Sequence, residues 1–358
     1  MADTVFILGA GASFEAGAPL MSNFLDVADD LMYKGAVNRN LKSFKNVFHM
    51  ISNLQLVHAK SFLDTYNIED LFGAIEMARI IKNLNGKSIE EIEELRNDLI
   101  TVISQTLSKC ISFPFIDNKI KPPQTYQNFV SMIEKMEQKP SIITFNYDIA
   151  LDYTLLFNHF NIDYCLHENS NLNYSPITNT IRLLKLHGSL NWGKCKKCSE
   201  IVDYNIGSYL SNMTQYRPIW DERIYISPND QLSHLKHCDE ALENVPVLVP
   251  PSWNKTEYHG SLTNVWRYAA QELSEARNII IIGYSLPESD SFFRYLFSLG
   301  TMGPSRIKQL LVYNPDNSGL VEGRYNSLVG RGIANRFEYI KMPFSKSIND
   351  IRDKLGLK

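Results

Sequence analysis

Two polar segments follow directly after short apolar runs, and both contain residue types suited to acid–base chemistry. Asn146 and Asp148 come at the end of the run Ser141–Phe145, and His187 follows Ile181–Leu186. An amide and a carboxylate can hold a ribose, a carboxamide or a water molecule, and an imidazole can accept a proton near pH 7. Asn and Asp also favour Asx turns and helix N-caps, so this spacing alone leaves both interpretations open. A lone His is more often a structural residue, but one at a further strand end of the same sheet favours a functional role.

A glycine-rich turn, Gly9-Ala10-Gly11-Ala12-Ser13, follows the apolar run Thr4–Leu8 and precedes helix-like sequence. Glycine lets the backbone come close to a pyrophosphate, and a helix N-terminus offers unpaired N–H groups to it. A GxG turn alone is weak evidence, because a tight turn needs no ligand. The order strand, turn, helix nevertheless favours phosphate binding.

Two later turns have the same character. Gly283-Tyr284-Ser285 follows the apolar run Asn278–Ile282, and Asn314-Pro315-Asp316 follows Gln309–Tyr313. Each is an ordinary loop signal in isolation. Ligands of open α/β sheets bind beyond the carboxyl ends of the strands, so five such strand ends together predict a cofactor crevice.

A sheet must bring these five segments to one edge. The apolar runs, with Val245–Val249 as a further strand, are of strand length, and helical stretches at Asp148–Phe160 and Ser261–Ala276 fall between them. Apolar runs buried on both faces and separated by helices predict an α/β fold. We expect a Rossmann-like, mostly parallel sheet with helices on both faces.

The rest of the chain predicts two insertions in a single catalytic domain of residues 1–358. Residues of about 22–135 have helical periodicity, with a capping box at Ser88 and Glu91, and are too long for one βα connection. Residues of about 190–260 are irregular and predict a small second module.

A Cys-x-x-Cys motif, Cys195 to Cys198, has the spacing of half a zinc knuckle. A second Cys-x-x-Cys is missing, and the nearest candidates are His234, His237 and Cys238, across a gap longer than common zinc patterns. We therefore expect a decayed site without zinc, and bound zinc is the lesser alternative.

Composition narrows the class of protein. The chain has 358 residues, 44% hydrophobic and 21% charged, which excludes a disordered chain, a collagen and a disulfide miniprotein. A net charge of −3 gives no strong field for nucleic acid or for an anionic membrane. A modest basic stretch from Lys34 to Lys45 is interpreted as a solvated helix face. No apolar run is long enough to cross a bilayer, no signal peptide is evident, and five cysteines suit a cytoplasmic protein.

The order of the motifs resembles the sirtuin (SIR2) superfamily. GAGAS, TFNYD, KLHGS, CxxC, IIGYSLP and VYNPD follow one another between residues 4 and 316. The chain is most similar to the SIR2-like group of bacterial anti-phage defence. That group's hallmarks look like the segments at Thr144–Asp148, Leu186–Trp192, Pro250–Lys255 and Gly283–Asp290.

The resemblance implies roles for individual residues. Asn146 would position water or the nicotinamide ribose of NAD+, Asp148 would meet the carboxamide, and His187 would act on the ribose hydroxyls or as a base. The remaining cofactor contacts would come from Gly9, Ala10, Gly11 and Ser13 near the phosphates, and from Gly283, Ser285 and Asn314 on the adenosine side.

The sequence departs from deacylase sirtuins in two places. Those enzymes follow the GAG turn with Gly-Ile-Pro-Asp-Phe-Arg, whereas Gly17–Ser22 reads Gly-Ala-Pro-Leu-Met-Ser. Their Phe-Gly-Glu stretch is replaced by Val249–Trp253. The resemblance thus implies that NAD+ binding is retained and that acyl-peptide handling is lost. This predicts an NAD+ glycohydrolase (NADase), releasing nicotinamide and ADP-ribose, that acts as a regulated effector of abortive infection.

Control is expected from homo-oligomerisation or from a separate activator, with a HerA-type ATPase or a short Argonaute as the partners that the resemblance suggests. Two rival hypotheses are an NAD-dependent protein deacylase and a non-catalytic sensor that binds NAD+ or ADP-ribose. Direct contact with nucleic acid or membrane is not expected.

Overall fold

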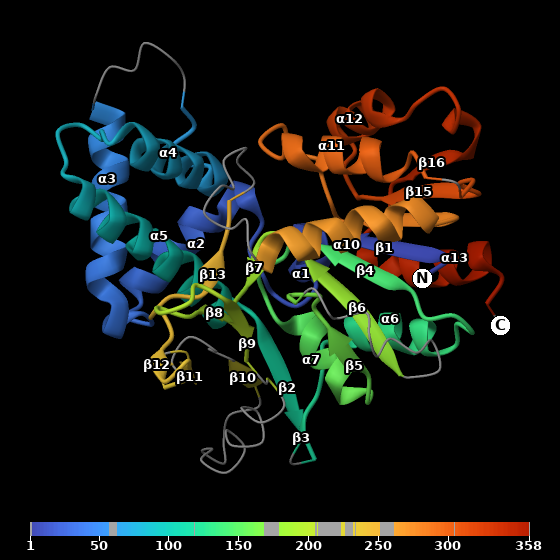
Figure 1. Cartoon of the computed structure of the whole chain (residues 1–358), viewed down its shortest axis with the longest axis horizontal. Helices are drawn as coiled ribbons and strands as arrows, with labels where there is room; N and C mark the ends of the chain where they lie inside the picture. Colours follow the sequence, from blue (N-terminus) through green and yellow to red (C-terminus); the bar gives the residue numbers. More distant parts are fainter. Residues whose placement is uncertain are drawn as a thin grey trace.

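A seven-stranded sheet forms the centre of the computed structural model (Figure 1), which describes residues 2–56, 63–117, 119–167, 179–204, 206, 223–225, 232, 234–250, 261–303 and 305–357. The strand order is β16-β15-β14-β1-β4-β6-β5, and every neighbouring pair is parallel. The strands are β1 Thr4–Leu8, β4 Ser141–Thr144, β5 Asn161–Asp163, β6 Thr180–Lys185, β14 Asn278–Ile282, β15 Gln309–Tyr313 and β16 Phe337–Ile340.

The register of the sheet aligns the carboxyl ends of its central strands. Leu8 at the end of β1 pairs with Ile282 of β14 on one side and with Thr144 of β4 on the other. Thr144 in turn pairs with Lys185 of β6. All residues of β1, β4 and β14 are buried, as expected for strands covered on both faces.

Helices cover both faces, which confirms the predicted fold class. In Figure 1, α10 (Ser261–Glu275) crosses one face of the sheet, and α6 (Gln124–Glu134) and α13 (Phe344–Leu355) lie behind the other. Phe129 of α6 anchors that layer, because its ring packs edge-on against Phe6 of β1 at 5.0 Å and Phe344 at 5.4 Å. The other helices of the sheet layers are α1 Ala10–Phe14, α7 Ala150–Phe157, α11 Ser291–Gly300 and α12 Leu320–Leu328, with a 3₁₀ turn at Ala334–Arg336.

Four helices form a block beside the sheet, on the left of Figure 1. They are α2 Phe24–Tyr33, α3 Leu41–Leu56, α4 Ile68–Ile81 and α5 Ile89–Cys110, with 3₁₀ turns at Met21–Asn23 and Asn38–Asn40. The predicted capping box starts α5, since Glu91 N donates to Ser88 Oγ at 3.2 Å and Ser88 N donates to the Glu91 carboxylate at 2.8 Å. After Cys110 the predicted helical stretch is interrupted by two unpredicted strands, β2 (Ser112–Ile116) and β3 (Lys119–Ile120), before α6 resumes it.

Short antiparallel strands make up the small module. They are β7 Gly188–Ser189, β8 Trp192–Lys194, β9 Ile201–Asp203, β11 Lys236–His237, β12 Glu240–Ala241 and β13 Val247–Leu248. β10 (Arg223–Tyr225) lies in the same stretch of sequence but pairs antiparallel with β2. The motif Pro250–Lys255 lies outside the described residues from residue 251 onward.

The prediction that Val245–Val249 is a strand of the parallel sheet is wrong. β13 is two residues long and pairs antiparallel with β7, outside the main sheet. Val247, Leu248 and Val249 are buried for a different reason: Val249 N donates to the His187 carbonyl at 2.9 Å, so the run lies along the loop that follows β6. Within the described residues, no helix has both the length and the apolar character needed to cross a membrane.

Candidate active site

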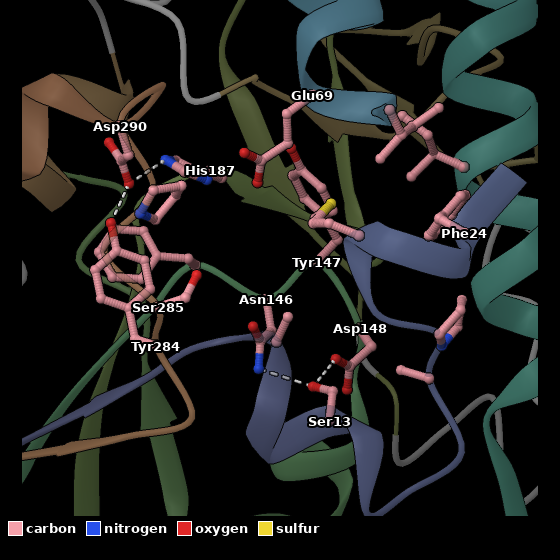
Figure 2. A pocket seen from close by; sticks show the side chains of 18 of the residues that line it. Ser13, Phe24, Glu69, Asn146, Tyr147, Asp148, His187, Tyr284, Ser285 and Asp290 are labelled. Carbon is pink, nitrogen blue, oxygen red and sulfur yellow. Dashed lines mark hydrogen bonds and ion pairs between the residues drawn. The ribbon is translucent and has the colours of Figure 1, made fainter. Parts of the chain in front are cut away.

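A cavity of about 290 Å³ lies at the carboxyl ends of β1, β4, β6 and β14 (Figure 2). Seven of the ten predicted site residues line it, namely Ala10, Ser13, Asn146, Asp148, His187, Gly283 and Ser285. They meet there because the central strands end in register. The other three, Gly9, Gly11 and Asn314, do not line the cavity.

Gly9 and Gly11 serve the contact between two turns. Gly11 N donates to the Gly283 carbonyl at 2.9 Å. A Cβ on Gly11 would lie 2.8 Å from Gly283 Cα, and one on Gly9 would lie 2.5 Å from Tyr284 Cα, so side chains there would force the turns apart. Gly283 itself has φ +63°, a left-handed conformation that favours glycine. These glycines therefore let the turns after β1 and β14 meet at the cavity floor.

Asn146 is held in one orientation by two acceptors. Its Nδ2 donates to the Gly9 carbonyl and to Ser13 Oγ, both at 2.8 Å, and Ser13 Oγ donates to Asp148. The reverse amide orientation would place an oxygen against the Gly9 carbonyl, so the assignment is unambiguous. Both amide hydrogens are used, and Oδ1 is left on the side away from Ser13 (Figure 2).

Asp148 is buried beneath this network, and both of its oxygens are engaged. Oδ2 accepts from Ser13, and Oδ1 accepts from Ala150 N at 2.9 Å. Burial raises the pKa of the Asp148 carboxyl, while the Lys185 ammonium and the Ser13 hydroxyl oppose that rise. The geometry thus favours Asp148 as the residue that positions Ser13 and Asn146, rather than as a free contact for a carboxamide.

His187 faces a buried carboxylate that the sequence analysis did not select. Its Nε2 lies 3.5 Å from Asp290 Oδ2, and Asp290 also accepts a hydrogen bond from Tyr284 Oη at 2.7 Å. The imidazole packs edge-on against Phe145, with ring centroids 5.1 Å apart. Asp290 follows β14 by only a few residues, and its place in the GYSLPxxD motif was the available signal.

The helical block supplies the wall opposite the sheet edge, which the sequence did not predict. This wall is mostly apolar and includes Met21, Phe24, Ile68, Phe72, Ile103 and Leu107. Glu69, the second residue of α4, contributes a carboxylate to this wall. It accepts a hydrogen bond from Ser289 Oγ at 2.8 Å. Desolvation raises the pKa of Glu69 to about 7, and the charges of Asp290 and Asp70 add to the rise.

Two further residues define the side of the cavity near Ser285. Arg324 of α12 lines the cavity and donates to the Ser285 carbonyl at 3.3 Å, a contact that the sequence did not predict. Asn314 uses its Oδ1 to accept from Asp316 N at 3.0 Å, so its side chain stabilises its own loop. Its contact with an adenosine remains a prediction.

Two further side chains that can bind a metal, His237 and Cys238, lie beside the Cys-x-x-Cys motif. Cys195, Cys198, His237 and Cys238 place their ligand atoms within 4.8 Å of one another. The first two come from the β8–β9 turn and the last two from the β11–β12 turn. His234 is not part of the cluster. The expected second Cys-x-x-Cys is thus replaced by an adjacent His-Cys pair, which a search for regular ligand spacing overlooks.

Comparison with known proteins finds no matching family model and no matching curated protein. Solved structures do match. One is described as Sir2 in complex with the inhibitor EX-527, 2'-O-acetyl-ADP-ribose and deacetylated p53 peptide; it is 12% identical over 99% of this chain and 94% of that chain, with a TM-score of 0.40. A complex described as Sir2, p53 peptide and NAD+ has the same identity, coverage and TM-score. Such TM-scores mark a coarse likeness, so the choice of ligand depends on the cavity itself.

Proposed function

We propose that this protein is an NAD+ glycohydrolase that cleaves NAD+ to nicotinamide and ADP-ribose. The observation that carries the proposal is the fixed amide of Asn146. Within the described part of the chain its carbonyl oxygen accepts no hydrogen bond, so it can accept one from water, at a strand-end cavity that His187 also lines. In the reaction, water adds to C1′ of the nicotinamide ribose, the C1′–N bond breaks with its electron pair going to nicotinamide, and one proton is released.

The chemistry of NAD+ suits this cavity. Nicotinamide leaves as a neutral molecule from a cationic substrate, so departure needs little acid assistance. The demand is to stabilise an oxocarbenium-like ribose and to fix the water, for which glycosidases use carboxylates. The Asn146 carbonyl dipole and the carboxylates Asp148, Asp290 and Glu69 can meet this demand electrostatically.

Water is favoured over an acyl-peptide as the acceptor. The Asp-Phe-Arg of deacylase sirtuins is absent from Gly17–Ser22, and Pro19 and Met21 of this same segment line the cavity instead. Hydrolysis is then the default fate of the cleaved ribose.

Product analysis of the purified protein with NAD+ tests the proposal. We expect nicotinamide and ADP-ribose in equal amounts, and neither from His187→Ala. Formation of O-acyl-ADP-ribose with an acetylated peptide would instead establish the deacylase. NAD+ affinity without turnover in all conditions would establish a sensor, and absence of affinity would contradict the cofactor itself.

We further propose that the activity is regulated, as in an anti-phage effector, through homo-oligomerisation or a separate activator. An NADase without control would drain the cell that makes it. The resemblance to SIR2-like defence proteins suggests a HerA-type ATPase or a short Argonaute as the activator. A monomer that is fully active on its own would contradict this part of the proposal.

We also propose that the cluster of Cys195, Cys198, His237 and Cys238 binds structural zinc. Tetrahedral zinc with bonds of about 2.3 Å to sulfur places two sulfur ligands about 3.8 Å apart. Cys198 and Cys238 Sγ lie 3.7 Å apart, and His237 Nδ1 lies 3.3 and 3.4 Å from them. The second ring nitrogen of His237 lies 3.7 Å from Glu200, a carboxylate that would orient the ring.

Metal analysis is expected to find about one zinc per chain, because four ligands make a closed structural site. His237→Ala should lose the metal and lower the melting temperature, since zinc would join the two turns of the small module. His234→Ala, an exposed histidine outside the cluster, is the matched control and should retain both. Equal metal content in the two variants would contradict the proposal.

A further inference from the structure

We propose that Glu69 is a third catalytic side chain of this cavity and accepts the proton of the attacking water. The inference rests on the proposed hydrolysis of NAD+ and names a residue that neither the motifs nor the resemblance points to. It comes from the helical block, far in sequence from the strand ends.

The position of Glu69 places its carboxylate in the cavity. Asn67 Oδ1 caps α4 by accepting from Glu69 N at 2.9 Å, which fixes the backbone at this point. From there the side chain reaches toward the sheet edge, and Figure 2 shows its carboxylate between His187 and Tyr147. Asn146 lies on the opposite side of the same space, so a water held by its Oδ1 would face Glu69.

Three carboxylates line the cavity, and their contacts separate them. Both oxygens of Asp148 accept hydrogen bonds, from Ser13 and from Ala150. Asp290 accepts from Tyr284 and faces His187, both through Oδ2, and its other oxygen, Oδ1, is buried and so closed to a water in the cavity. Glu69 accepts from Ser289 through Oε2 alone, and among the described residues its Oε1 has no hydrogen-bond partner. Glu69 is therefore the carboxylate with an oxygen available to a water molecule.

The surroundings of Glu69 suit a proton acceptor near neutral pH. It is faced by Ser289 and Asp290 from the loop after β14, by His187 after β6 and by Asp70 on its own helix. Desolvation, with the repulsion of Asp290 and Asp70, raises the pKa to about 7, and the Ser289 hydroxyl opposes the rise. A base whose pKa lies near the working pH combines availability with proton affinity.

The same pKa means that ionised Glu69 destabilises the fold relative to protonated Glu69. The folded-state value of about 7 exceeds the ordinary 4.5 of a glutamate, so the folded protein binds the proton more tightly than the unfolded chain. Stability therefore falls as the pH rises from 4.5 through 7, where the carboxyl ionises in the cavity. A purely structural role does not explain why an ionisable side chain stands where its ionisation lowers the stability of the fold.

The proton balance of the step is simple. The water oxygen forms a bond to C1′ as the C1′–N bond breaks, and the electron pair of that bond goes to the nicotinamide nitrogen. One hydrogen of the water donates to Asn146 Oδ1, and the other passes to Glu69 as a proton. Glu69 then releases it to solvent.

Glu69→Gln tests the proposal, because glutamine keeps the shape and the Ser289 contact but cannot take up the proton. We expect kcat for NAD+ cleavage at pH 8 to fall about 10²-fold or more, the usual contribution of a general base, with KM changed much less. Wild-type activity should decline as the pH is lowered through 7, and the residual activity of the variant should lack that decline.

Two matched variants report on the same group. Ser289→Ala removes the bond that lowers the pKa of Glu69, so the acid limb of its pH profile should move to higher pH. Asp70→Asn removes a repelling charge outside the cavity, so its limb should move to lower pH with kcat at pH 8 retained. Opposite shifts would not arise if Glu69 were only structural.

Thermal unfolding separates loss of function from loss of fold. Glu69→Gln should be at least as stable as the wild type, with its advantage larger at pH 8 than at pH 5. Wild-type turnover with an unchanged pH profile in Glu69→Gln would overturn this proposal alone. Absence of NAD+ turnover in the wild type would overturn the proposed function and this inference with it.

Discussion

Asn146→Ala is expected to lower the rate of NAD+ cleavage by about 10²–10³-fold, the scale of losing a preorganised dipole at a reacting centre. The variant removes the carbonyl oxygen that would hold the water. It also removes the two hydrogen bonds to Gly9 and Ser13 that fix the cavity floor. Steady-state kinetics with NAD+ and direct measurement of NAD+ affinity would show the loss mainly in kcat.

Asn158→Ala is the matched control for this prediction. Asn158 also donates an amide hydrogen to a backbone carbonyl, that of Thr154 at 2.8 Å, but it lies at the end of α7 and does not line the cavity. Its turnover should stay close to that of the wild type. A rate for Asn146→Ala within a few-fold of the wild type would remove Asn146 from the mechanism.

Lys185→Met is expected to cause the largest loss of stability, about 3–5 kcal/mol in the free energy of unfolding, because it leaves a buried charge without its partner. Lys185 is buried under the site, and its Nζ lies 3.1 Å from Asp152 Oδ2 and donates to the Asp148 carbonyl at 2.5 Å. Asp152 is equally buried and, among the described residues, would keep one side-chain partner, Tyr164, whose hydroxyl donates to it at 2.7 Å. Denaturant unfolding measures the loss.

Two further variants test the cause of that loss. In the double variant Lys185→Met with Asp152→Asn, the buried charge is gone, so part of the stability should return. Lys354→Met breaks a surface pair with Glu338 and should cost about 1 kcal/mol or less. Equal losses from Lys185→Met and from Lys354→Met would contradict the argument.

The sheet and its polar edge could be predicted because they follow from local patterns. Runs such as Thr4–Leu8 and Asn278–Ile282 are apolar on both faces, and the polar residues after them fall at the carboxyl edge in any parallel sheet. Val245–Val249 is also an apolar run but lies outside the sheet. Burial against a loop and burial within a sheet both favour apolar residues, so the sequence does not distinguish the two.

The opposite wall of the cavity could not be predicted from such patterns. Glu69 stands at the start of a helix, where an acidic residue is ordinary, and only the packing of α4 over the sheet edge turns it inward. Asp290 and Arg324 depend likewise on how α11 and α12 follow their strands. The cysteine cluster joins two turns about 40 residues apart in sequence, a pairing set by the fold of the small module.

The pairing of β1 with β14 determines how much of the chain must be synthesised before the cavity can form. Thr4 lies beside Asn278, and the walls of the cavity extend from Ala10 to Arg324. Contacts so distant in sequence close slowly and only after the intervening chain exists. On the ribosome, a nascent chain that has not reached β14 has no neighbour for one edge of β1 and no Gly283 turn to meet Gly11. A chain still short of β14 therefore has no cavity in which to bind a nucleotide, and we expect a product terminated before β14 to be inert.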